Sequence, residues 1–221
     1  MNVFVVGNGK LANELLSQLQ FNQVKAWHER ANNNNPAIIV HAGSGRELEE
    51  IMTYCRNTNS VLVELSTGSQ IEEIAIDFSA VVCPNINILM LKFMHMISNH
   101  GQQFQQYNIQ LSESHQSEKT SVPGTAVYLA NAFDLPVEDI HSIRDPEQQQ
   151  HLCGVPSEHL SRHAVHQITI QDSSCSISLE SRVYGDSPYA SGVLKVIHAI
   201  ENHQLEQRLY TIHELIEKEW L

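Results

Sequence analysis

The sequence predicts an α/β fold with a Rossmann-type parallel sheet that forms a nucleotide domain, followed by a smaller α/β domain with an open mixed sheet. Three observations predict it. Short β-branched strands alternate with amphipathic helices, a glycine turn separates the first strand from the first helix, and the pattern changes after Asn85. We expect residues 1–86 and 200–221 to form the first domain and residues 87–199 to form the second.

The first domain opens on Val3–Val6, a β-branched and aromatic run that is typical of a buried strand. Leucines recur at helical spacing after Lys10, so a helix follows. The same reasoning predicts strands at Val24–Trp27, Ile38–Val40, Val61–Leu65 and Ala80–Val82, with helices at Arg46–Tyr54 and Ile71–Ile76. The run Asn32–Asn35 before Pro36 predicts a loop.

The second domain begins with a helix predicted over Ile88–His100. Alternation predicts a strand at Tyr107–Leu111, and a helix follows at Gly124–Ala132. Two short strands then flank a predicted hairpin turn, and the C-terminal segment is mostly helical. The two strands are Ile168–Ile170 and Ser176–Glu180, and the turn between them is Asp172–Ser174. A helix is predicted at Tyr189–Ile200, a short extended segment at Arg208–Thr211 and a loop at Gln148–Gln150.

Composition excludes several classes of function. The 221 residues carry a formal charge of −12, from 25 acidic and 13 basic side chains, and such a field repels nucleic-acid backbones. No segment approaches the ~20 apolar residues of a membrane span. The opening apolar run stops at Gly7, too early for a signal peptide, and the four cysteines are scattered. We therefore expect reduced thiols and a cytoplasmic protein that binds neither nucleic acid nor membrane.

The 13 histidines equal all Lys and Arg together, which raises the question of a metal site. The best candidate is His163-x-x-His166, with His159, Glu158 and Cys153 nearby. Apolar alternation over Val165–Ile170 predicts a strand, however, which puts the two histidines on opposite faces. We expect no metal site, and we expect most of the other histidines to be surface residues.

The turn Gly7-Asn8-Gly9 between strand and helix is typical of a dinucleotide-binding unit. Glycine lets the backbone approach a pyrophosphate, and the helix N-terminus offers N–H groups to the anion. Glu29 lies at the distance where an acid binds the adenosine ribose, while Arg30 suits a 2′-phosphate. The expected cofactor is therefore NADH or NADPH. A tight turn without a ligand is the alternative interpretation.

The segment Glu113–Thr125 carries the strongest chemical signal. A strand leads His115 and Lys119 into a turn, and Gly124-Thr125 then opens a helix. Lysine supplies a cation and a proton, while the helix N-terminus supplies donors to a carboxylate. This set suits an anionic substrate that must be protonated. The alternative is that both side chains are ordinary solvated loop residues.

This segment resembles the substrate motif of the 4-hydroxy-tetrahydrodipicolinate reductase (dihydrodipicolinate reductase) family, Glu-x-His-His-x-x-Lys-x-Asp-x-Pro-Ser-Gly-Thr. The matching residues are Glu113, His115, Lys119, Pro123, Gly124 and Thr125. Further resemblances follow in the family's order along nearly the whole chain: Gly7-Asn8-Gly9, Glu29-Arg30, Ser66-Thr67-Gly68, Cys83-Pro84-Asn85-Ile86-Asn87, Ile140–Arg144, Tyr189–Gly192 and Leu209–Thr211.

The resemblance implies hydride transfer from NAD(P)H to a cyclic unsaturated dicarboxylate in lysine and diaminopimelate biosynthesis. It implies that Lys119 is the general acid and that His115 assists protonation, with Gln116, Gly124 and Thr125 at the substrate. It also implies that residues 1–86 and 200–221 form the dinucleotide-binding domain, and that residues 87–199 form a domain for substrate binding and oligomerisation that builds a homotetramer. The residues it implies for the cofactor are Gly7, Gly9, Lys10, Leu11, Glu29, Arg30, Ser66, Thr67, Gly68, Pro84 and Asn85.

The chain departs from the family motif at the substrate. Gln116 replaces the second histidine, Ser121 replaces the aspartate, and the Pro-Ser-Gly-Thr sequence lacks its serine. Gln116 can donate a hydrogen bond but carries no charge. Two alternatives therefore remain open: a non-catalytic nucleotide-binding homologue with a regulatory role, and a reductase for another amino-acid-derived imine.

Overall fold

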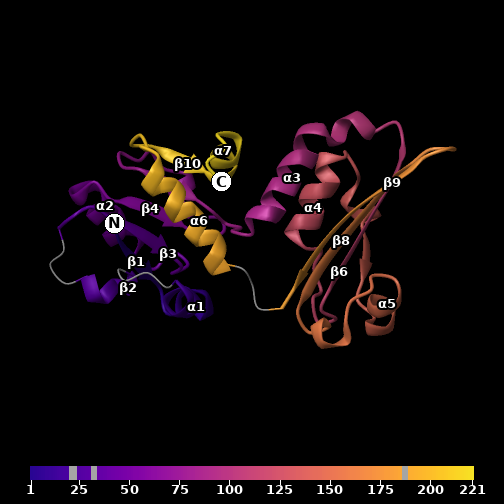
Figure 1. Ribbon diagram of the computed structural model, residues 1–221, viewed down its shortest axis with the longest axis horizontal. Coiled ribbons are helices and arrows are strands. Elements are labelled where there is room, and N and C mark those ends of the chain that lie inside the picture. Colours follow the sequence, from indigo (N-terminus) through magenta and orange to yellow (C-terminus); the bar gives the residue numbers. More distant parts are fainter. Residues whose placement is uncertain (20–23, 31–33, 186–188) are drawn as a thin grey trace. The chain divides into compact units, whose positions relative to one another are not determined.

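The computed structural model describes residues 1–19, 24–30, 34–185 and 189–221 (Figure 1). The chain forms two compact units, one of Met1–Leu91 with Pro188–Leu221 and one of Lys92–Ser187. Asn32 and Asn33 of the loop expected at Asn32–Asn35 lie outside the described residues. The predicted fold class is confirmed, with a parallel sheet in the first unit and a mixed sheet in the second.

The first unit is built on a six-stranded sheet whose described pairings are all parallel. Its strand order is β10-β5-β4-β3-β1-β2. After β2 the chain crosses back over β1, so the order of the strands reverses at β1, the strand that precedes the glycine turn. In such sheets ligands bind outside the carboxyl ends of the strands at this switch point. The strands are β1 (Asn2–Val6), β2 (Val24–Ala26), β3 (Ala37–His41), β4 (Val61–Glu64), β5 (Ala80–Val82) and β10 (Leu209–Thr211).

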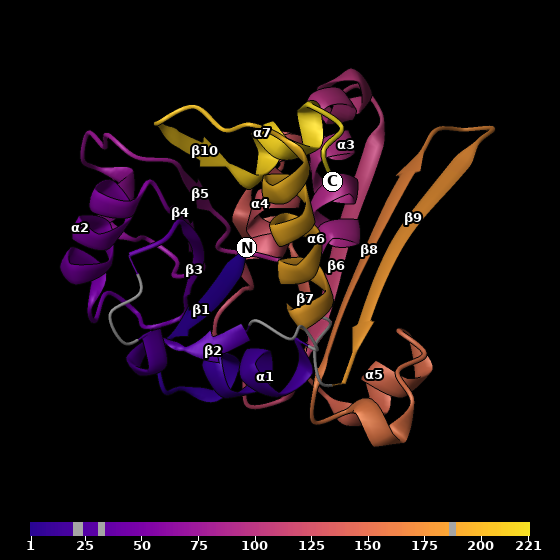
Figure 2. The same ribbon diagram turned by 60° about the vertical axis from the view of Figure 1, so that its left-hand side comes forward.

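Apolar residues cover both faces of this sheet. Val3 and Val5 of β1 belong to one core, and Phe4 and Val6 belong to the other, as strand alternation requires. Helices α1 (Lys10–Gln18), α6 (Tyr189–Asn202) and α7 (Ile212–Glu217) contribute to the first core, and α2 (Leu48–Thr58) to the second (Figure 2). The boundary expected near residue 200 would leave α6 outside this unit. In the structure α6 packs into the first core and belongs to the first unit.

Two local expectations for the first unit are corrected. The helix expected over Ile71–Ile76 is only a 3-10 turn, η2 (Gln70–Glu72), because so short a segment forms too few hydrogen bonds to offset helix nucleation. Helix α2 begins at Leu48 rather than Arg46, since Glu47 before it has a left-handed φ of 64°. A further short turn, η1 (Trp27–Arg30), follows β2.

Gly192 of α6 lies against the backbone that follows β5. A Cβ at this position would be 1.8 Å from the carbonyl oxygen of Ile86. We expect Gly192→Ala to lower the free energy of unfolding by about 3 kcal/mol, because overpacking against backbone cannot be relieved by a rotamer change. Urea unfolding followed by circular dichroism measures this. The exposed Lys195→Ala on the same helix is the control, and equal stability of the two variants would contradict the packing described.

The second unit contains a four-stranded sheet of order β7-β6-β8-β9. Strand β7 is parallel to β6, and the other pairs are antiparallel. Its strands are β6 (Asn108–His115), β7 (His141–Ile143), β8 (His163–Gln171) and β9 (Ser176–Tyr184). Its helical elements are α3 (Ile88–His100), which begins in the first unit, α4 (Gly124–Ala132), α5 (Pro146–His151), η3 (Gly101–Phe104), η4 (Val137–Asp139) and η5 (Ser157–His159).

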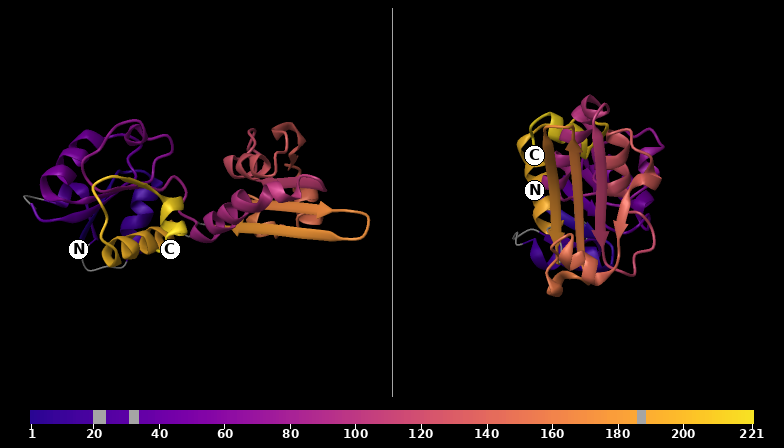
Figure 3. Two further views of the ribbon diagram at one scale, coloured as in Figure 1. Left: turned by 90° about the horizontal axis from the view of Figure 1, so that it is seen from above. Right: turned by 90° about the vertical axis from the view of Figure 1, so that its right-hand side faces the viewer.

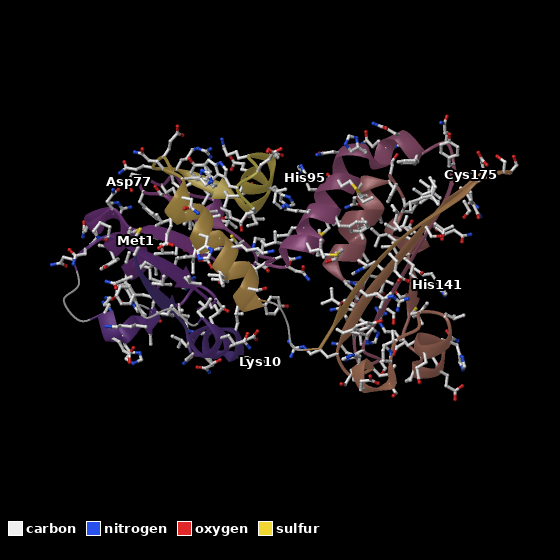
Figure 4. All side chains as sticks on the ribbon, in the orientation of Figure 1. Met1, Lys10, Asp77, His95, His141 and Cys175 are labelled. Carbon is white, nitrogen blue, oxygen red and sulfur yellow. The ribbon has the colours of Figure 1, made fainter. Side chains whose placement is uncertain are left out.

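Helices α3 and α4 lie together on one face of this sheet, and the right-hand view of Figure 3 looks onto the other face. A Cβ on Gly101, just after α3, would be 2.5 Å from the carbonyl oxygen of Ala132, the last residue of α4. The β8–β9 hairpin carries Cys175 at its tip (Figure 4). The helical face of the sheet is therefore closed and its opposite face is accessible within this unit.

Strands β6, β8 and β9 of the second unit extend beyond the predicted ranges. Strand β6 was expected to end at Leu111 but continues to His115, through the buried polar residues Glu113 and Ser114. Helix α5 was expected to be a loop. It forms because Asp145 caps its N-terminus, accepting a hydrogen bond from the backbone of Gln148, and Pro146 suits the first turn.

Each of the four cysteines, all within the described part of the chain, is a free thiol, and three of them are buried. Among the described residues, no helix has the length and apolar character needed to cross a membrane. The described side chains also include no group of three or more His, Cys, Asp or Glu placed to hold a metal ion.

Candidate active site

A buried carboxylate organises the carboxyl end of β6. Glu113 is 1% exposed, and its Oε2 lies 2.8 Å from Nδ1 of His115. Arg144, directly after β7, donates two hydrogen bonds to the same carboxylate, at 2.5 and 3.1 Å. Burial works to raise the pKa of Glu113, but hydrogen bonds from His115, Arg144 and Ser142 lower it to about 2. Glu113 is therefore ionised and fixes the orientation of the His115 ring.

Arg144 links this carboxylate to the turn that carries Lys119. Its Nε donates to the carbonyl oxygen of Lys119 at 2.9 Å, while its other nitrogens hold Glu113. The amide of Lys119 in turn donates to the carbonyl oxygen of Gln116 at 3.0 Å. The structure thus brings His115 and Lys119 into one hydrogen-bonded assembly. Both side chains are only partly exposed, as is Gln116.

Gln149 is a second support that the sequence did not indicate. This fully buried side chain of α5 donates to the carbonyl oxygen of His115 at 2.7 Å and to that of Ile143 at 3.2 Å. It therefore joins the ends of β6 and β7. Read as part of a polar loop, Gln149 gave no signal, whereas the Asp145-Pro146 helix start beside Arg144 could have indicated that this loop is structured.

The turn after Lys119 leads into the N-terminus of α4. Gly124 and Thr125 are its first two residues, Pro123 is the N-cap, and no side-chain cap or first-turn acid occurs among the described residues of this helix. Its first N–H groups therefore have no internal partner in the helix, and its dipole favours an anion. This arrangement fits a carboxylate, as the sequence analysis expected for Gly124 and Thr125.

Two histidines of β8 lie on opposite faces of the sheet, as alternation predicts. His166 is the cross-strand partner of Glu113, and its ring meets that of His115 edge-on at 5.6 Å between centroids. His163 instead contacts the hydroxyl of Ser114 at 2.8 Å. Burial, with the nearby charge of His115, lowers the pKa of His166 to about 4, so it stays neutral. The neutral ring of His166 thus packs against the ring of His115.

The glycine turn of the first unit is shaped by close backbone contact. Gly7 has a φ of +118°, and a Cβ there would be 2.5 Å from the carbonyl oxygen of Ala42, after β3. Gly9 is the N-cap of α1, and the described residues provide neither a side-chain cap nor an acid in its first turn, which starts at Lys10 and Leu11. A pyrophosphate fits this helix start, because its backbone donors and dipole remain available to an anion.

A cavity of about 440 Å³ adjoins this turn. Its lining includes predicted residue Gly7, but it also includes Arg46 and Glu47 from the loop after β3, which the sequence analysis assigned to a helix. The remaining lining residues are Val5, Asn8, Asn13, Leu16, Ala26, Trp27 and His28. A cation beside a helix N-terminus adds to the fit for a phosphate group.

The two residues expected to select the nucleotide, Glu29 and Arg30, both lie in η1. The carboxylate of Glu29 accepts a hydrogen bond from the amide of Ala26 at 3.2 Å. The guanidinium of Arg30 stacks 3.9 Å from the centre of the Trp27 ring and forms an ion pair with Glu50. Neither residue lines the cavity. The cation of Arg30 therefore already has a carboxylate partner.

The remaining residues expected at the cofactor follow β4 and β5. Ser66, Thr67 and Gly68 form a turn after β4, in which the amide of Ser66 donates to the carboxylate of Glu64 at 2.7 Å. Pro84 and Asn85 follow β5. All five lie on connections that leave carboxyl ends of parallel strands, the edge of the sheet at which the glycine turn also lies.

Known proteins of one enzyme family are similar to this chain. The family model described as "Dihydrodipicolinate reductase, C-terminus" matches residues 86–216. Among curated proteins, 4-hydroxy-tetrahydrodipicolinate reductase 1, chloroplastic, of Arabidopsis thaliana is 29% identical over 151 residues, which is 62% of this chain and 44% of the relative. A probable 4-hydroxy-tetrahydrodipicolinate reductase 1, chloroplastic, of Oryza sativa subsp. japonica is 32% identical over 126 residues, or 52% and 37% of the two chains.

Among solved structures, the dipicolinate-bound dihydrodipicolinate reductase from Paenisporosarcina sp. TG-14 matches 96% of this chain and 97% of its own, with a TM-score of 0.64 and 16% identity. That similarity shows the fold. The matches to the curated plant proteins span less than half of those proteins' length. The family match, in contrast, covers more than half of the chain and includes β6, Lys119, α4 and Arg144. The chain belongs to the dihydrodipicolinate reductase family.

Proposed function

We propose that the protein is an NAD(P)H-dependent reductase that converts 4-hydroxy-tetrahydrodipicolinate to tetrahydrodipicolinate in lysine and diaminopimelate biosynthesis. The observation that carries the proposal is the Glu113–His115–Arg144 assembly, which holds the Lys119 turn beside the N-terminus of α4. The two plant relatives bear the name of this reductase. The assembly combines an acid, an oriented imidazole and an anion-binding helix start, which are the groups such a reduction requires.

The 4-hydroxyl of the substrate leaves as water, which gives a conjugated imine. Reduction of that imine adds one hydride to carbon and one proton to the same system, and a bound dihydronicotinamide supplies the hydride. Lys119 donates the proton from its ammonium group and balances a substrate carboxylate before it does so. His115, oriented by Glu113, stabilises the charge that develops on the ring nitrogen. Gly124 and Thr125 hold a carboxylate through the start of α4, and Gln116 offers a neutral amide donor to it.

The proposed cofactor residues are those of the glycine turn and its neighbouring connections. The amides after Gly9 bind the pyrophosphate, and Glu29 binds the adenosine ribose. Ser66-Thr67-Gly68 and Pro84-Asn85 flank the nicotinamide half. Because the cation of Arg30 already pairs with the carboxylate of Glu50, the proposed cofactor is NADH or NADPH alike.

Calorimetry separates this proposal from the two alternatives. We expect the protein to bind NADH or NADPH, and then to bind pyridine-2,6-dicarboxylate, a planar analogue of the cyclic dicarboxylate, in the presence of the cofactor. Binding of the nucleotide without the dicarboxylate favours the non-catalytic homologue or a reductase of another imine. Failure to bind either nucleotide contradicts the proposal altogether.

The proposal includes a homotetramer in the cytoplasm. The face of the four-stranded sheet opposite α3 and α4 carries an open depression of about 730 Å³, lined mainly by polar side chains such as Gln110, Ser112, Gln167 and Glu180. This is the surface that we propose for assembly. The free thiols agree with a reducing compartment. Light scattering measures the assembly, and a monomer at micromolar concentration would contradict it.

A further inference from the structure

A buried histidine and a buried glutamate meet where β3 and β4 end. The side chains of His41 and Glu64 are both 0% exposed, and Nδ1 of His41 lies 2.7 Å from Oε2 of Glu64. Nε2 of His41 lies 2.8 Å from the carbonyl oxygen of Arg46. The second carboxylate oxygen of Glu64 accepts the amide of Ser66 at 2.7 Å. The pair therefore touches the loop after β3 and the turn after β4.

The partners of His41 fix its protonation state. A carboxylate and a backbone carbonyl can only accept hydrogen bonds, so both ring nitrogens must donate, and only the imidazolium has two N–H donors. Burial opposes this charge, but the hydrogen bond and charge of Glu64 and the carbonyl of Arg46 raise the pKa of His41. Burial likewise works to raise the pKa of Glu64, and its bonds to His41 and Ser66 lower it. The pair is ionised.

The loop that His41 holds is strained. Ser44, Gly45 and Glu47 have φ angles of 54°, 85° and 64°, and two of these residues carry side chains that disfavour the left-handed region. Such strain persists only where the surroundings over-determine it, and it is typical of ligand sites. Here the strained loop carries Arg46 and Glu47 into the lining of the cavity beside the glycine turn.

We infer that the His41–Glu64 ion pair is a positioning device for the nucleotide: it holds the Gly43–Glu47 loop and the Ser66–Gly68 turn in their binding conformations. The inference rests on the proposed function, since it assumes that these two connections bind NAD(P)H. Arg46 is the cation that the device delivers to the cofactor phosphates. Neither side chain of the pair touches the cofactor itself, because both are fully buried.

The ion pair makes the affinity for the cofactor depend on pH. The charged groups that face His41 are Glu64 on β4 and Glu47 on the loop, both of which favour the imidazolium. Cys83, after β5, remains a neutral thiol because burial and Glu64 raise its pKa. The folded pKa of His41 lies above the usual value of about 6.5. Affinity is therefore full below the folded pKa of His41 and falls as the pH rises through it, when the bond to Arg46 loses its proton.

The test is calorimetric titration of NADH and NADPH into the full chain from pH 6 to pH 10, for wild type, His41→Asn and Glu64→Gln. At pH 6 we expect the dissociation constant of His41→Asn to be about tenfold higher than that of wild type. The constant of this variant is nearly independent of pH, because the amide keeps one bond but carries no charge. In turnover, KM for the cofactor rises while kcat changes less than about twofold. Glu64→Gln has one acceptor oxygen for two donors, Nδ1 of His41 and the amide of Ser66, so its dissociation constant rises as well.

The control is His100→Asn, an exposed histidine at the end of α3. Circular dichroism and melting temperature are recorded for every variant, and Glu64→Gln serves the test if His41→Asn does not fold. Identical nucleotide affinity and pH profile in wild type and a folded variant overturns the inference and leaves the proposed function intact. A wild-type protein that binds neither nucleotide overturns the proposed function instead.

Discussion

Lys119→Ala is expected to lower kcat for reduction by about 10²–10⁴-fold, the range that a positioned general acid contributes. The loss follows from removal of the ammonium group from a turn whose backbone is fixed by Arg144 and by its own bond to Gln116. Since that anchoring uses the carbonyl and amide of residue 119, alanine preserves the turn. Steady-state oxidation of NADH or NADPH, followed at 340 nm, measures the effect.

The dissociation constant of the cofactor is the internal control for Lys119→Ala, because the residues proposed for the nucleotide belong to the other unit. We expect it to change by less than about twofold. Lys92→Ala removes an exposed lysine of α3 and is the matched variant with wild-type activity. Turnover by Lys119→Ala within a factor of three of wild type would remove the role assigned to Lys119.

Glu113→Gln is expected to lower the free energy of unfolding by about 3 kcal/mol, since removing one partner of a buried ion pair leaves the other charge uncompensated. Arg144 would then face a neutral amide in a site where Glu113 is 1% exposed. Chemical unfolding at pH 7 measures the change. The exposed Glu118→Gln is the control in the same segment and should stay within about 0.5 kcal/mol of wild type.

Acid titration gives this prediction a second readout. The pKa of Glu113 is about 2 in the folded protein, against about 4.3 for glutamate in an unfolded chain. The stability that its ionisation contributes is therefore complete above about pH 4.3 and is lost as the pH falls toward 2. Glu113→Gln should lack this part of the acid transition. A mutant and wild type with parallel stability profiles between pH 5 and pH 2 would contradict the ionised assembly.

The double variant Glu113→Gln with Arg144→Met separates pairing from simple burial. If the two side chains stabilise one another, the double variant loses less stability than the sum of the two single losses, by about 1–3 kcal/mol. Strict additivity would mean that the two residues act independently. The same cycle, read in kcat, reports how far the pair orients His115 and the Lys119 turn.

Sequence patterns predicted the architecture because its signals are local. The alternation of Val3–Val6 with the leucines of α1 needs only a few consecutive residues, and the structure confirms the α/β class with its parallel and mixed sheets. The His-Lys segment was also local, since β6 delivers His115 directly into the turn of Lys119. Which predicted residues hold the cofactor remains a proposal.

The supporting residues escaped prediction because their partners are distant in the chain. Arg144 reaches Glu113 across 31 residues, and His41 meets Glu64 across 23, so neither pair has a local pattern. Gln149 lies in a glutamine-rich run that is typical of a loop. Only Asp145 and Pro146 before it indicate the start of a helix. The prediction of a helix over Ile71–Ile76 was wrong although its pattern is local. A few apolar residues at helical spacing do not suffice to form a helix.

The most direct test of the central claim is turnover with 4-hydroxy-tetrahydrodipicolinate generated freshly in the cuvette, with NADH and NADPH supplied in turn. We expect oxidation of at least one cofactor that depends on the substrate, is inhibited by pyridine-2,6-dicarboxylate and disappears in Lys119→Ala. A protein that binds both nucleotide and dicarboxylate yet oxidises neither cofactor with this substrate would contradict the proposed reductase activity.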